Sequence, residues 1–556
     1  MYLNEMSKKH KLFFDFLEFE FDFKKNDTDI IGVFHILPDF LIFSEAINKI
    51  ANLKLVIPKP NSINKDILSK VEDKYNIRTD INRNNIEEII KEIDPKRKTI
   101  FLDIGAYFSE IKDELKSILG ENFLGIIEDT ENGHQKYLKK ELDFNFYSVA
   151  RSPLKYNEDY LVGSAITFSI EAILRKKGII LKNKKAGIIG GGKIGKSILH
   201  NLLKKGSIVS FFDFNTLISS NLISEGFNFE EKEYLLKNSD IVCLATGNKS
   251  LRKNDFSLIK KGAYVFLATS SDDELDLEYL NNNYEKEDLG DYFIKYSNKK
   301  NKHYFYLIND GNTVNFVHGT TVGDFILFVH AEIILAIFEL INNFYKRREN
   351  YLISQKKREL ISKIWIEIFV KNKKDNLNNE LYLDLIKTLK AYDKNDREKK
   401  LLEIVKVVPN IISRKNFFGH FTASALIFNN KKQLLLVFHK KLKMFLQPGG
   451  HLEKNDKSLY LAAKREAEEE TGLKVEENKK YLSKAILLDI HKIPSSFEKM
   501  ENEHYHFDFM FVFDVKNEKV ILQKEEVSDY RWVDLDYDFK DSAIKKAINL
   551  IKSESL

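Results

Sequence analysis

The fold of the C-terminal part of the chain is decided by the segment Pro448-Gly449-Gly450-His451-Leu452-Glu453, followed by Ala462-Ala463-Lys464-Arg465-Glu466-Ala467-Glu468-Glu469-Glu470-Thr471-Gly472. Read as a helix from about Ser458, at roughly 100° per residue, the second segment places Glu466, Glu469 and Glu470 on its apolar stripe. Inward carboxylates at this spacing repel one another unless a cation lies between them, and oxygen ligands suit Mg²⁺ or Mn²⁺. The segment therefore predicts a divalent-metal site, with a merely charged, exposed helix as the alternative.

The same residues resemble the Nudix box, whose core Arg-Glu-x-x-Glu-Glu-x-Gly is matched by Arg465, Glu466, Glu469, Glu470 and Gly472. The resemblance implies that the three glutamates bind the metal and that Arg465 orients the box. It further implies that one of the glutamates or a nearby carboxylate takes a proton from water. The expected reaction is hydrolysis of a pyrophosphate in a nucleoside diphosphate derivative.

The loop before this helix fits a Nudix subgroup that reads Gln-Pro-Gly-Gly-His-x-Glu, matched here by 447–453. In that subgroup the loop carries one extra residue, so either Glu453 or Asp456 is expected to pair with Arg465. Gly450 and Glu453 are candidate substrate residues.

A strand is expected over 503–511, where apolar and polar residues alternate. Alternation places His504, His506 and Asp508 on one face. These three residues line the substrate cleft or add a ligand in one interpretation, and form an outward polar face in the other.

Composition bounds the remaining possibilities. The chain has 556 residues, which predicts two to four domains. Its 88 basic and 83 acidic residues leave a net charge of +5, so no specific nucleic-acid partner is predicted. The single cysteine, Cys243, fits a reducing compartment. No signal segment is apparent, and the apolar run 325–341 contains charged residues and is short for a bilayer, so we expect a cytoplasmic protein without membrane contact.

A dinucleotide-binding pattern lies between residues 185 and 213. A strand runs into Gly190, Gly192 and Gly195, and the next strand ends at Asp213, 18 residues after Gly195. Such glycines let a backbone approach a pyrophosphate at a helix N-terminus, and the acid bonds ribose hydroxyls. Asp213 repels a 2′-phosphate, which favours NAD over NADP. A layer of this kind that has lost its ligand is the alternative.

The first 345 residues resemble S-adenosylhomocysteine hydrolase in a shortened form. The resemblance rests on 125–133, the glycine loop, the run Thr246-Gly247-Asn248-Lys249, and the short segments 261–263, 274–276 and 314–316. It implies bound NAD, with Thr246 and Asn248 among its contacts, and a possible homo-oligomer. By position it also implies the substrate residues His35, Asp129, Lys155 and Asp159, although each is equally compatible with an ordinary polar residue in a cleft.

Several positions depart from that family. Tyr160 stands for an asparagine, Ser164 for a cysteine, Ile104 for an aspartate and Ser270 for a histidine. Because several acid–base groups are lost together, the full hydrolase cycle is not expected. Binding is the function more easily retained.

The predicted fold class is therefore α/β and multidomain: a two-lobed Rossmann-type parallel-sheet module followed by a Nudix α/β/α sandwich. We expect the first module over 1–345, with the NAD-binding lobe at about 163–318, a helical connector over 346–380 and the Nudix domain over 381–556. Strands are expected at 30–34, 53–57, 99–102, 208–212, 240–245, 263–267 and 433–438, and helices at 40–50, 86–93 and 164–175.

Three hypotheses of function follow. The first is a Mg²⁺-dependent Nudix hydrolase whose NAD-binding module binds, senses or regulates. The second is an NAD-assisted hydrolase or lyase acting on an adenosine-type nucleoside, with the Nudix domain as accessory. The third treats the N-terminal module as a non-catalytic NAD sensor or oligomerisation platform.

Overall fold

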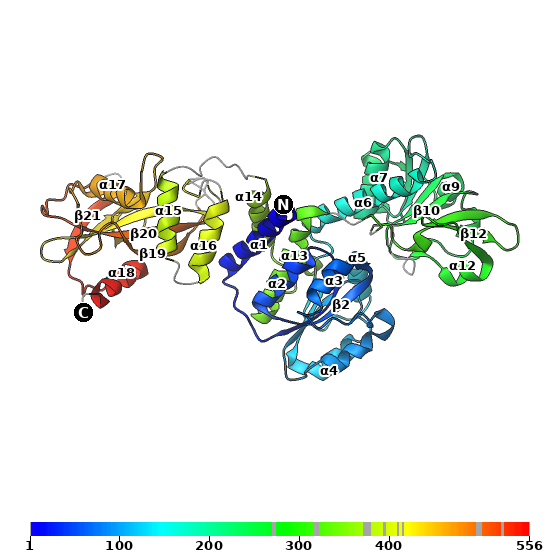
Figure 1. Ribbon diagram of the computed structural model, residues 1–556, viewed down its shortest axis with the longest axis horizontal. Coiled ribbons are helices and arrows are strands. Elements are labelled where there is room, and N and C mark those ends of the chain that lie inside the picture. Colours follow the sequence, from blue (N-terminus) through cyan, green and yellow to red (C-terminus); the bar gives the residue numbers. More distant parts are fainter. Residues whose placement is uncertain are drawn as a thin grey trace. The chain divides into compact units, whose positions relative to one another are not determined.

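The structure is a computed structural model that describes residues 2–269, 274–315, 317–318, 322–370, 380–392, 396–408, 411–413, 416, 418–495, 503–523 and 527–554. Ser270 and part of the expected connector lie outside these ranges. The chain forms two compact units (Figure 1). Unit 1 comprises Met1–His10 and Phe23–Ser362, and unit 2 comprises Lys11–Asp22 and Lys363–Leu556.

The first lobe of unit 1 is a parallel sheet in the order β2-β1-β3-β4-β5. Its strands are β1 (Asp29–Ile36), β2 (Asn52–Ile63), β3 (Thr99–Asp103), β4 (Phe123–Glu128) and β5 (Phe146–Ser148). Its helices are α2 (Phe40–Ile50), α3 (Lys65–Val71), α4 (Lys112–Leu119) and α5 (Glu131–Leu138). The helix expected at 86–93 is instead a 3₁₀ segment, Arg83–Glu92, kinked at Asn85.

The second lobe has six parallel strands in the order β13-β10-β9-β6-β7-β8, extended by the antiparallel strands β12 and β11. The strands are β6 (Lys185–Ile189), β7 (Ile208–Phe212), β8 (Asn228–Phe229), β9 (Ile241–Leu244), β10 (Tyr264–Leu267), β11 (Tyr284–Asp288), β12 (Phe293–Asn298) and β13 (Tyr304–Ile308). The helices are α7 (Lys193–Lys204), α8 (Thr216–Ser224), α9 (Lys232–Asn238), α10 (Asp255–Leu258) and α12 (Leu277–Asn283). The expected parallel-sheet module is thus confirmed.

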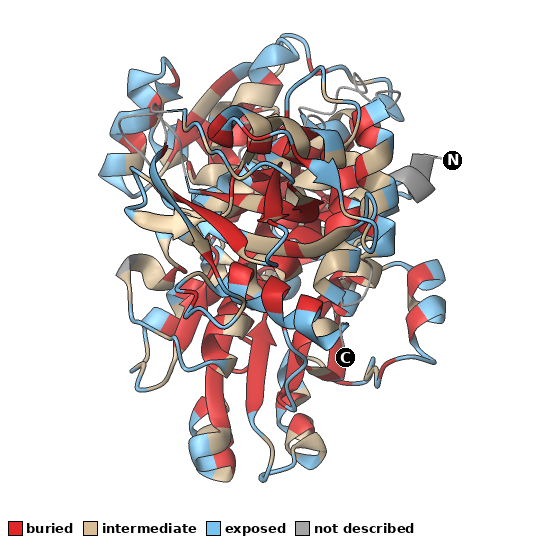
Figure 2. Ribbon diagram, turned by 90° about the vertical axis from the view of Figure 1, so that its left-hand side faces the viewer, coloured by how far each residue is buried: buried red, intermediate tan, exposed pale blue. Residues whose placement is uncertain are grey.

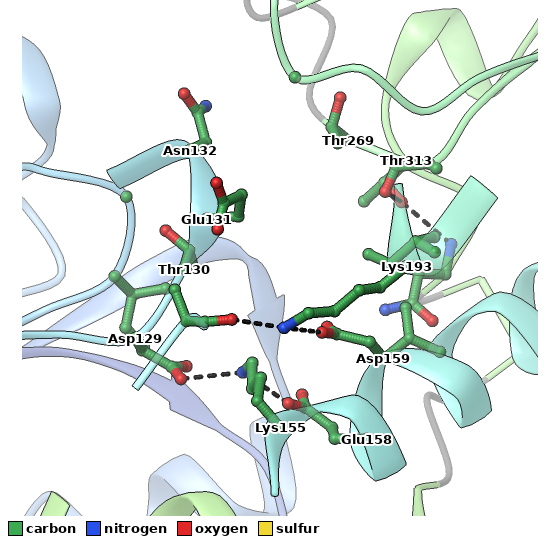
Figure 3. A pocket seen from close by; sticks show the side chains of 18 of the residues that line it. Asp129, Thr130, Glu131, Asn132, Lys155, Glu158, Asp159, Lys193, Thr269 and Thr313 are labelled. Carbon is green, nitrogen blue, oxygen red and sulfur yellow. Dashed lines mark hydrogen bonds and ion pairs between the residues drawn. The ribbon is translucent and has the colours of Figure 1, made fainter. Parts of the chain in front are cut away.

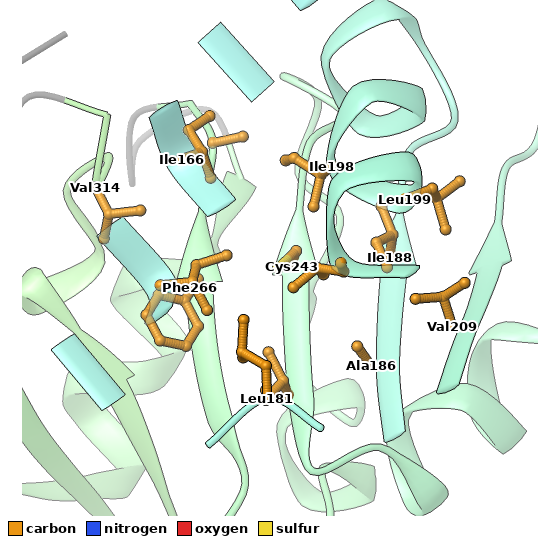
Figure 4. Packing of buried hydrophobic residues seen from close by; sticks show 14 of the residues in the cluster. Ile166, Leu181, Ala186, Ile188, Ile198, Leu199, Val209, Cys243, Phe266 and Val314 are labelled. Carbon is orange, nitrogen blue, oxygen red and sulfur yellow. The ribbon is translucent and has the colours of Figure 1, made fainter. Parts of the chain in front are cut away.

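A closely packed core fills the space between this sheet and its helices. Ile188 of β6 and Phe266 of β10 flank Cys243 of β9, and Ile198 and Leu199 of α7 cover them (Figure 4). Burial raises the pKa of the Cys243 thiol to about 12. The cysteine is therefore a small core residue.

Two long helices join the lobes of unit 1. Helix α6 (Lys155–Arg175) packs on α7, and α13 (Ile326–Ile341) packs against α6, α2 and β4. Helix α6 begins nine residues before the expected 164, which places Lys155 and Asp159 in its first turns. The apolar run 325–341 forms α13, which is buried over nearly its whole length, as expected. Among the helices that the structure describes, none has the length and apolar composition needed to span a bilayer.

Unit 2 is built on a mixed sheet in the order β16-β15-β14-β20-β18, with β17 paired to β14, β19 to β20 and β21 to β15. The strands are β14 (Gly419–Phe428), β15 (Leu434–His439), β16 (Met444–Leu446), β17 (Gly449–His451), β18 (Glu476–Glu477), β19 (Ala485–Ile493), β20 (His504–Asp514) and β21 (Val527–Val533). The helices are α14 (Gln355–Phe369), which begins in unit 1, α15 (Glu380–Ala391), α16 (Asp396–Val407), α17 (Leu459–Thr471) and α18 (Ser542–Ser553).

Helices cover both faces of this sheet. Tyr460 of α17 packs on Phe511 and Phe513, whereas α18 covers the apolar cluster of Leu426 and Met510 on the other face. Buried residues gather in the strands and on the inner faces of the helices (Figure 2). The arrangement is the expected α/β/α sandwich.

The first helix, α1 (Tyr2–Phe21), contributes its later turns to unit 2. Phe16 and Phe19 pack edge-on against Phe418, with ring centroids 4.8 and 5.5 Å apart. Lys400 of α16 forms an ion pair with Glu18 at 2.5 Å. This segment supplies aromatic packing to a domain whose other residues begin more than 300 positions later.

Candidate functional site

The carboxylate helix of unit 2 is fixed at both ends by its own sequence. Ser458 caps the N-terminus, where its hydroxyl accepts a hydrogen bond from the backbone N–H of Leu461 at 3.2 Å. Gly472 ends the helix with φ of +64°, a left-handed conformation that glycine adopts without steric cost. The helix that carries the glutamates therefore spans the range that the sequence predicts.

Arg465 ties this helix to the preceding loop. Its guanidinium donates to both carboxylate oxygens of Asp456, at 3.1 and 3.0 Å, and to the carbonyl of His451 at 3.0 Å. It also contacts Glu466 at 2.9 Å and Glu469 at 3.1 Å. Of the two loop acids proposed from the sequence, Asp456 is thus the one that pairs with Arg465.

Glu453 takes a different part in the same loop. Its backbone N–H donates to Asp456 at 2.7 Å, and Glu453 itself is exposed. The loop acid is therefore held from two sides, by a guanidinium and by the main chain.

The three glutamates differ in burial. Glu470 is 6% exposed, and its carboxylate accepts a hydrogen bond from the N–H of Gly449 at 3.3 Å. The Glu466 side chain is 16% exposed and lies so close to Gly450 that a Cβ there would come within 2.4 Å of its carboxyl carbon. Gly450 thus makes room for Glu466.

The prediction that all three carboxylates continue the buried stripe is wrong for Glu469, because its side chain is 53% exposed. At about 100° per residue it lies roughly 80° from Leu459, at the edge of the stripe. The periodicity gives the correct side of the helix but not the depth of burial.

The predicted residues of β20 lie on one face and are substantially covered. His504 and Asp508 are buried, and His506 is half-buried. The Asp508 carboxylate accepts hydrogen bonds from the hydroxyls of Thr422 at 2.8 Å and Ser424 at 2.6 Å, while burial raises its pKa. Burial, together with the neighbouring histidines, lowers the pKa of His506 to about 2.

Unit 1 contains a cavity of about 1230 Å³ lined by residues of both its lobes. The four substrate residues predicted from the sequence, His35, Asp129, Lys155 and Asp159, all line it. The hydroxyl of Ser62 lies 2.5 Å from Nδ1 of His35, and burial lowers the pKa of His35 to about 3. The imidazole of His35 is therefore neutral at physiological pH.

Ion pairs cross this cavity (Figure 3). The Lys155 ammonium lies 2.8 Å from Asp129 and 2.5 Å from Glu158, and Lys193 lies 3.3 Å from Asp159. Burial opposes the charge of Lys155, but the three neighbouring carboxylates outweigh it and raise its pKa. Sequence reasoning missed Glu158 and Lys193; the spacing of Glu158 three residues after Lys155 was an available signal.

The glycine loop lies on the same cavity, at the N-terminus of α7. Gly190 has φ of +103°, and a Cβ at Gly195 would lie 1.8 Å from the carbonyl oxygen of Gly190. At Gly192, by contrast, a Cβ would meet no atom within 4 Å. The Asp213 carboxylate accepts a hydrogen bond from the N–H of Gly191 at 2.6 Å. Asp213 therefore lies beside the loop, as the pattern predicts.

Glu274, a buried residue of the segment 274–276 to which the sequence analysis gave no role, holds the loop after β9. Its carboxylate accepts hydrogen bonds at 2.6 to 2.7 Å from Thr246 Oγ1, Gly247 N, Ser250 Oγ and Thr269 Oγ1. The Thr246 hydroxyl also accepts from the N–H of Asn248 at 3.0 Å, and both residues line the cavity.

The fold and the two sites define a protein that joins a Rossmann-type parallel-sheet module to an α/β/α domain bearing a glutamate-rich helix. Residues 419–546 match the family model of the NUDIX domain. Residues 164–321 match that of the S-adenosyl-L-homocysteine hydrolase NAD binding domain. The chain thus contains a Nudix domain and a domain like the NAD-binding domain of adenosylhomocysteinase.

Similar proteins cover parts of the chain. S-inosyl-L-homocysteine hydrolase of Methanopyrus kandleri is 26% identical over 208 residues, which are 36% of this chain and 49% of the relative. Adenosylhomocysteinase of Saccharolobus solfataricus is 28% identical over 238 residues, 42% of this chain and 55% of the relative. The chain spans about half the length of the curated relatives it matches.

Solved structures match about a quarter of the chain. The MutT protein from Methanosarcina mazei Go1 is 21% identical, covering 24% of this chain and 94% of its own, with a TM-score of 0.19. A hydrolase of the NUDIX family from Clostridium perfringens is 24% identical, covering 24% of this chain and 97% of its own, also with a TM-score of 0.19.

Proposed function

We propose that the protein hydrolyses a pyrophosphate bond in a nucleoside diphosphate derivative, with Mg²⁺ or Mn²⁺ held by Glu466, Glu469 and Glu470. The observation that carries this proposal is the set of contacts made by Arg465, which join α17 to the loop that precedes it and leave more carboxylates than cations around the guanidinium. Oxygen donors in this number suit a hard divalent cation.

The roles of the residues follow from their positions. A divalent ion bound here supplies polarisation of the pyrophosphate and acidification of water. Arg465 fixes the spacing between helix and loop through Asp456 and the His451 carbonyl. One of the three glutamates or a nearby carboxylate accepts the proton from water, and the exposure of Glu469, the highest of the three, favours Glu469 for this role. Gly450 keeps the approach to Glu466 open.

Replacement of the two terminal glutamates tests the proposal. Glu469→Gln and Glu470→Gln, separately and together, are expected to lower Mg²⁺-dependent release of phosphate or nucleoside monophosphate by roughly 10²- to 10⁴-fold. Glu468→Gln is the matched control, because Glu468 lies on the same helix and an amide oxygen preserves its acceptance from Val475 at 3.3 Å. Unchanged turnover in the double variant would falsify the assignment.

For unit 1 we propose binding of NAD, in a sensing, regulatory or substrate-presenting role. The close approach of Gly195 to Gly190, and Asp213 beside the loop, support it, since they form a cradle at a helix N-terminus. The cavity of about 1230 Å³ has room for a nucleoside beside the cofactor. The Lys155–Asp129 and Lys193–Asp159 pairs line this space.

The alternative roles of unit 1 are separated by one spectroscopic experiment. If the module performs redox-assisted chemistry, adding adenosine to the NAD-loaded protein produces bound NADH, seen as nicotinamide absorbance or fluorescence. If it is a sensor or oligomerisation platform, NAD raises the unfolding temperature or changes the oligomeric mass, and adenosine leaves the nicotinamide spectrum unchanged.

A further inference from the structure

Five histidines gather on one face of the sheet in unit 2, out of 13 in the whole chain. They come from four neighbouring strands: His451 of β17, His420 of β14, His504 and His506 of β20, and His491 of β19. We refer to them as the histidine cluster.

Strand register explains why these residues meet. His420 lies directly opposite His506, and His506 directly opposite His491. His451 lies opposite Thr422, two residues along β14 from His420. Because register partners and residues two apart share a face, the rings project from the same side of the sheet.

Three members of the cluster bring ligand atoms together. One ring nitrogen from each of His420, His451 and His506 lies within 4.8 Å of the others. Their ring centroids are 4.6 to 5.4 Å apart. His420 is buried whereas His451 and His506 are half-buried, so the group is reachable from solvent.

The histidine cluster is distinct from the carboxylate site. Gly450, which precedes His451 in β17, faces Glu466 of α17. Since alternate residues of a strand point to opposite faces, His451 points away from that helix. The two sites are linked through the loop by the hydrogen bond from Arg465 to the His451 carbonyl.

We propose that His420, His451 and His506 form a binding site for a divalent transition ion of the Zn²⁺ type, with a fourth position open to water or a ligand. Imidazole nitrogen suits zinc and its neighbours in the transition series, whereas the glutamates of α17 suit magnesium. Zinc–nitrogen bonds of about 2.1 Å in a tetrahedron place donors about 3.4 Å apart. Small rotations of the side chains bring the three nitrogens from their present spacing to that distance.

The surroundings of the cluster resemble the outer shell of a metal site. His491 Nδ1 lies 2.7 Å from the Asp489 carboxylate, and Asp489 lies opposite the buried Asp508. Carboxylates hydrogen-bonded to ligand histidines orient the rings and strengthen binding. The His491–Asp489 pair borders the three proposed ligands, with the His491 ring centroid 5.7 Å from that of His506.

Cobalt binding to the full-length protein tests the site, with excess Mg²⁺ present to occupy the carboxylates. Wild type is expected to bind one equivalent of Co²⁺ with the strong visible absorption of a low-coordinate nitrogen site, and Zn²⁺ displaces it. His451→Gln and His506→Gln are each expected to weaken binding by roughly tenfold or more, since even outer-shell changes cost that much. His439→Gln, in the same unit but outside the cluster, and Glu470→Gln are expected to bind as wild type.

Three results would overturn the proposal. These are wild-type cobalt affinity in both histidine variants, loss of cobalt in Glu470→Gln, or no cobalt uptake in excess Mg²⁺. The last result assigns the histidines to substrate contact. Far-ultraviolet circular dichroism of the metal-free variants checks their folding. X-ray absorption of zinc-loaded wild type needs no variant; it is expected to show imidazole nitrogens at about 2.0 to 2.1 Å, and an oxygen-only shell contradicts the site.

Discussion

The carboxylate site of unit 2 and the cavity of unit 1 both bring acids together but balance their charge differently. Around α17, the Arg465 guanidinium pairs with three carboxylates, those of Asp456, Glu466 and Glu469, and a fourth, that of Glu470, accepts a hydrogen bond from the N–H of Gly449. In the ion-pair cluster of the cavity, two ammonium groups pair with three carboxylates: Lys155 and Lys193 with Asp129, Glu158 and Asp159. Buried charge is costly unless paired, so the first site calls for an external cation and the second largely neutralises itself.

Removal of divalent ions has the largest expected effect on activity. It distinguishes the two sites, because only the carboxylate site of unit 2 is expected to depend on a divalent ion. EDTA is expected to lower pyrophosphate hydrolysis by roughly a thousandfold or more, because several kcal/mol of transition-state stabilisation are lost. NAD binding in unit 1 is expected to stay the same. Phosphate release and NAD titration on one sample check both, and a parallel loss of NAD affinity would contradict the comparison.

The glycine loop offers a matched pair of variants. Gly195→Ala is expected to destabilise unit 1 by about 1 to 3 kcal/mol through overpacking, because its Cβ would lie 1.8 Å from the Gly190 oxygen. Gly192→Ala meets no protein atom within 4 Å, so its unfolding temperature stays nearly that of wild type. NAD affinity falls in both, by roughly tenfold for Gly192→Ala if a phosphate approaches this backbone. Equal unfolding temperatures in the two variants would count against the loop geometry.

The variant Arg465→Lys tests whether Arg465 orients the carboxylate site. Lysine keeps the charge but loses the fork that binds both oxygens of Asp456. We expect kcat to fall roughly 10-fold and unit 2 to lose about 1 to 2 kcal/mol of stability. Lys464→Arg, the reverse exchange at a position of the same helix that pairs with Glu468, serves as the control. A lysine variant with full activity would remove the orienting role of Arg465.

Replacing either of two glutamates of α13 by glutamine gives the smallest expected effect, a change in the free energy of unfolding. The two substitutions change it in opposite directions. Burial raises the pKa of Glu332 from 4.5 to about 7. Its neutral form therefore favours the folded state at low pH, and this contribution disappears as the pH rises through 7. Glu332→Gln is expected to match wild type at pH 4.5 and exceed its stability at pH 8 by on the order of 1 kcal/mol.

Glu339 is the internal control for that pH effect. Burial would raise the pKa of Glu339, but Lys357 at 2.8 Å, Tyr147 and Arg348 outweigh it and lower the pKa. Its stabilising contribution is present at neutral pH and is lost as the pH falls. Glu339→Gln is therefore expected to be less stable than wild type at pH 7, and denaturant unfolding at both pH values checks the pair. Shifts of the same sign would show that pairing does not decide them.

Local sequence patterns predicted many of the helices and strands correctly. The short β-rich runs at 99–102 and 208–212 and the Gly-x-Gly-x-x-Gly turn each form the element expected of them. The helix bearing the box begins and ends where Ser458 and Gly472 indicate. These elements depend on neighbours in sequence, which is why periodicity and capping residues suffice to find them.

Features set by distant residues were not predictable in this way. The aromatic packing of Phe16 and Phe19 on Phe418 joins segments some 400 residues apart. The histidine cluster depends on the register between β14 and β20, which no local pattern fixes. The exposure of Glu469 follows from its place at the edge of the helical stripe and its pairing with Arg465.

Cys243 is the one cysteine of the chain, so its thiol can be labelled without an engineered substitution. With its pKa raised to about 12 and its side chain enclosed by Ile188 and Phe266, it reacts with alkylating reagents only when the sheet of the second lobe opens. The rate of alkylation thus reports the opening of the second lobe in the intact chain. Slower alkylation with added dinucleotide would give a binding assay without an engineered tag.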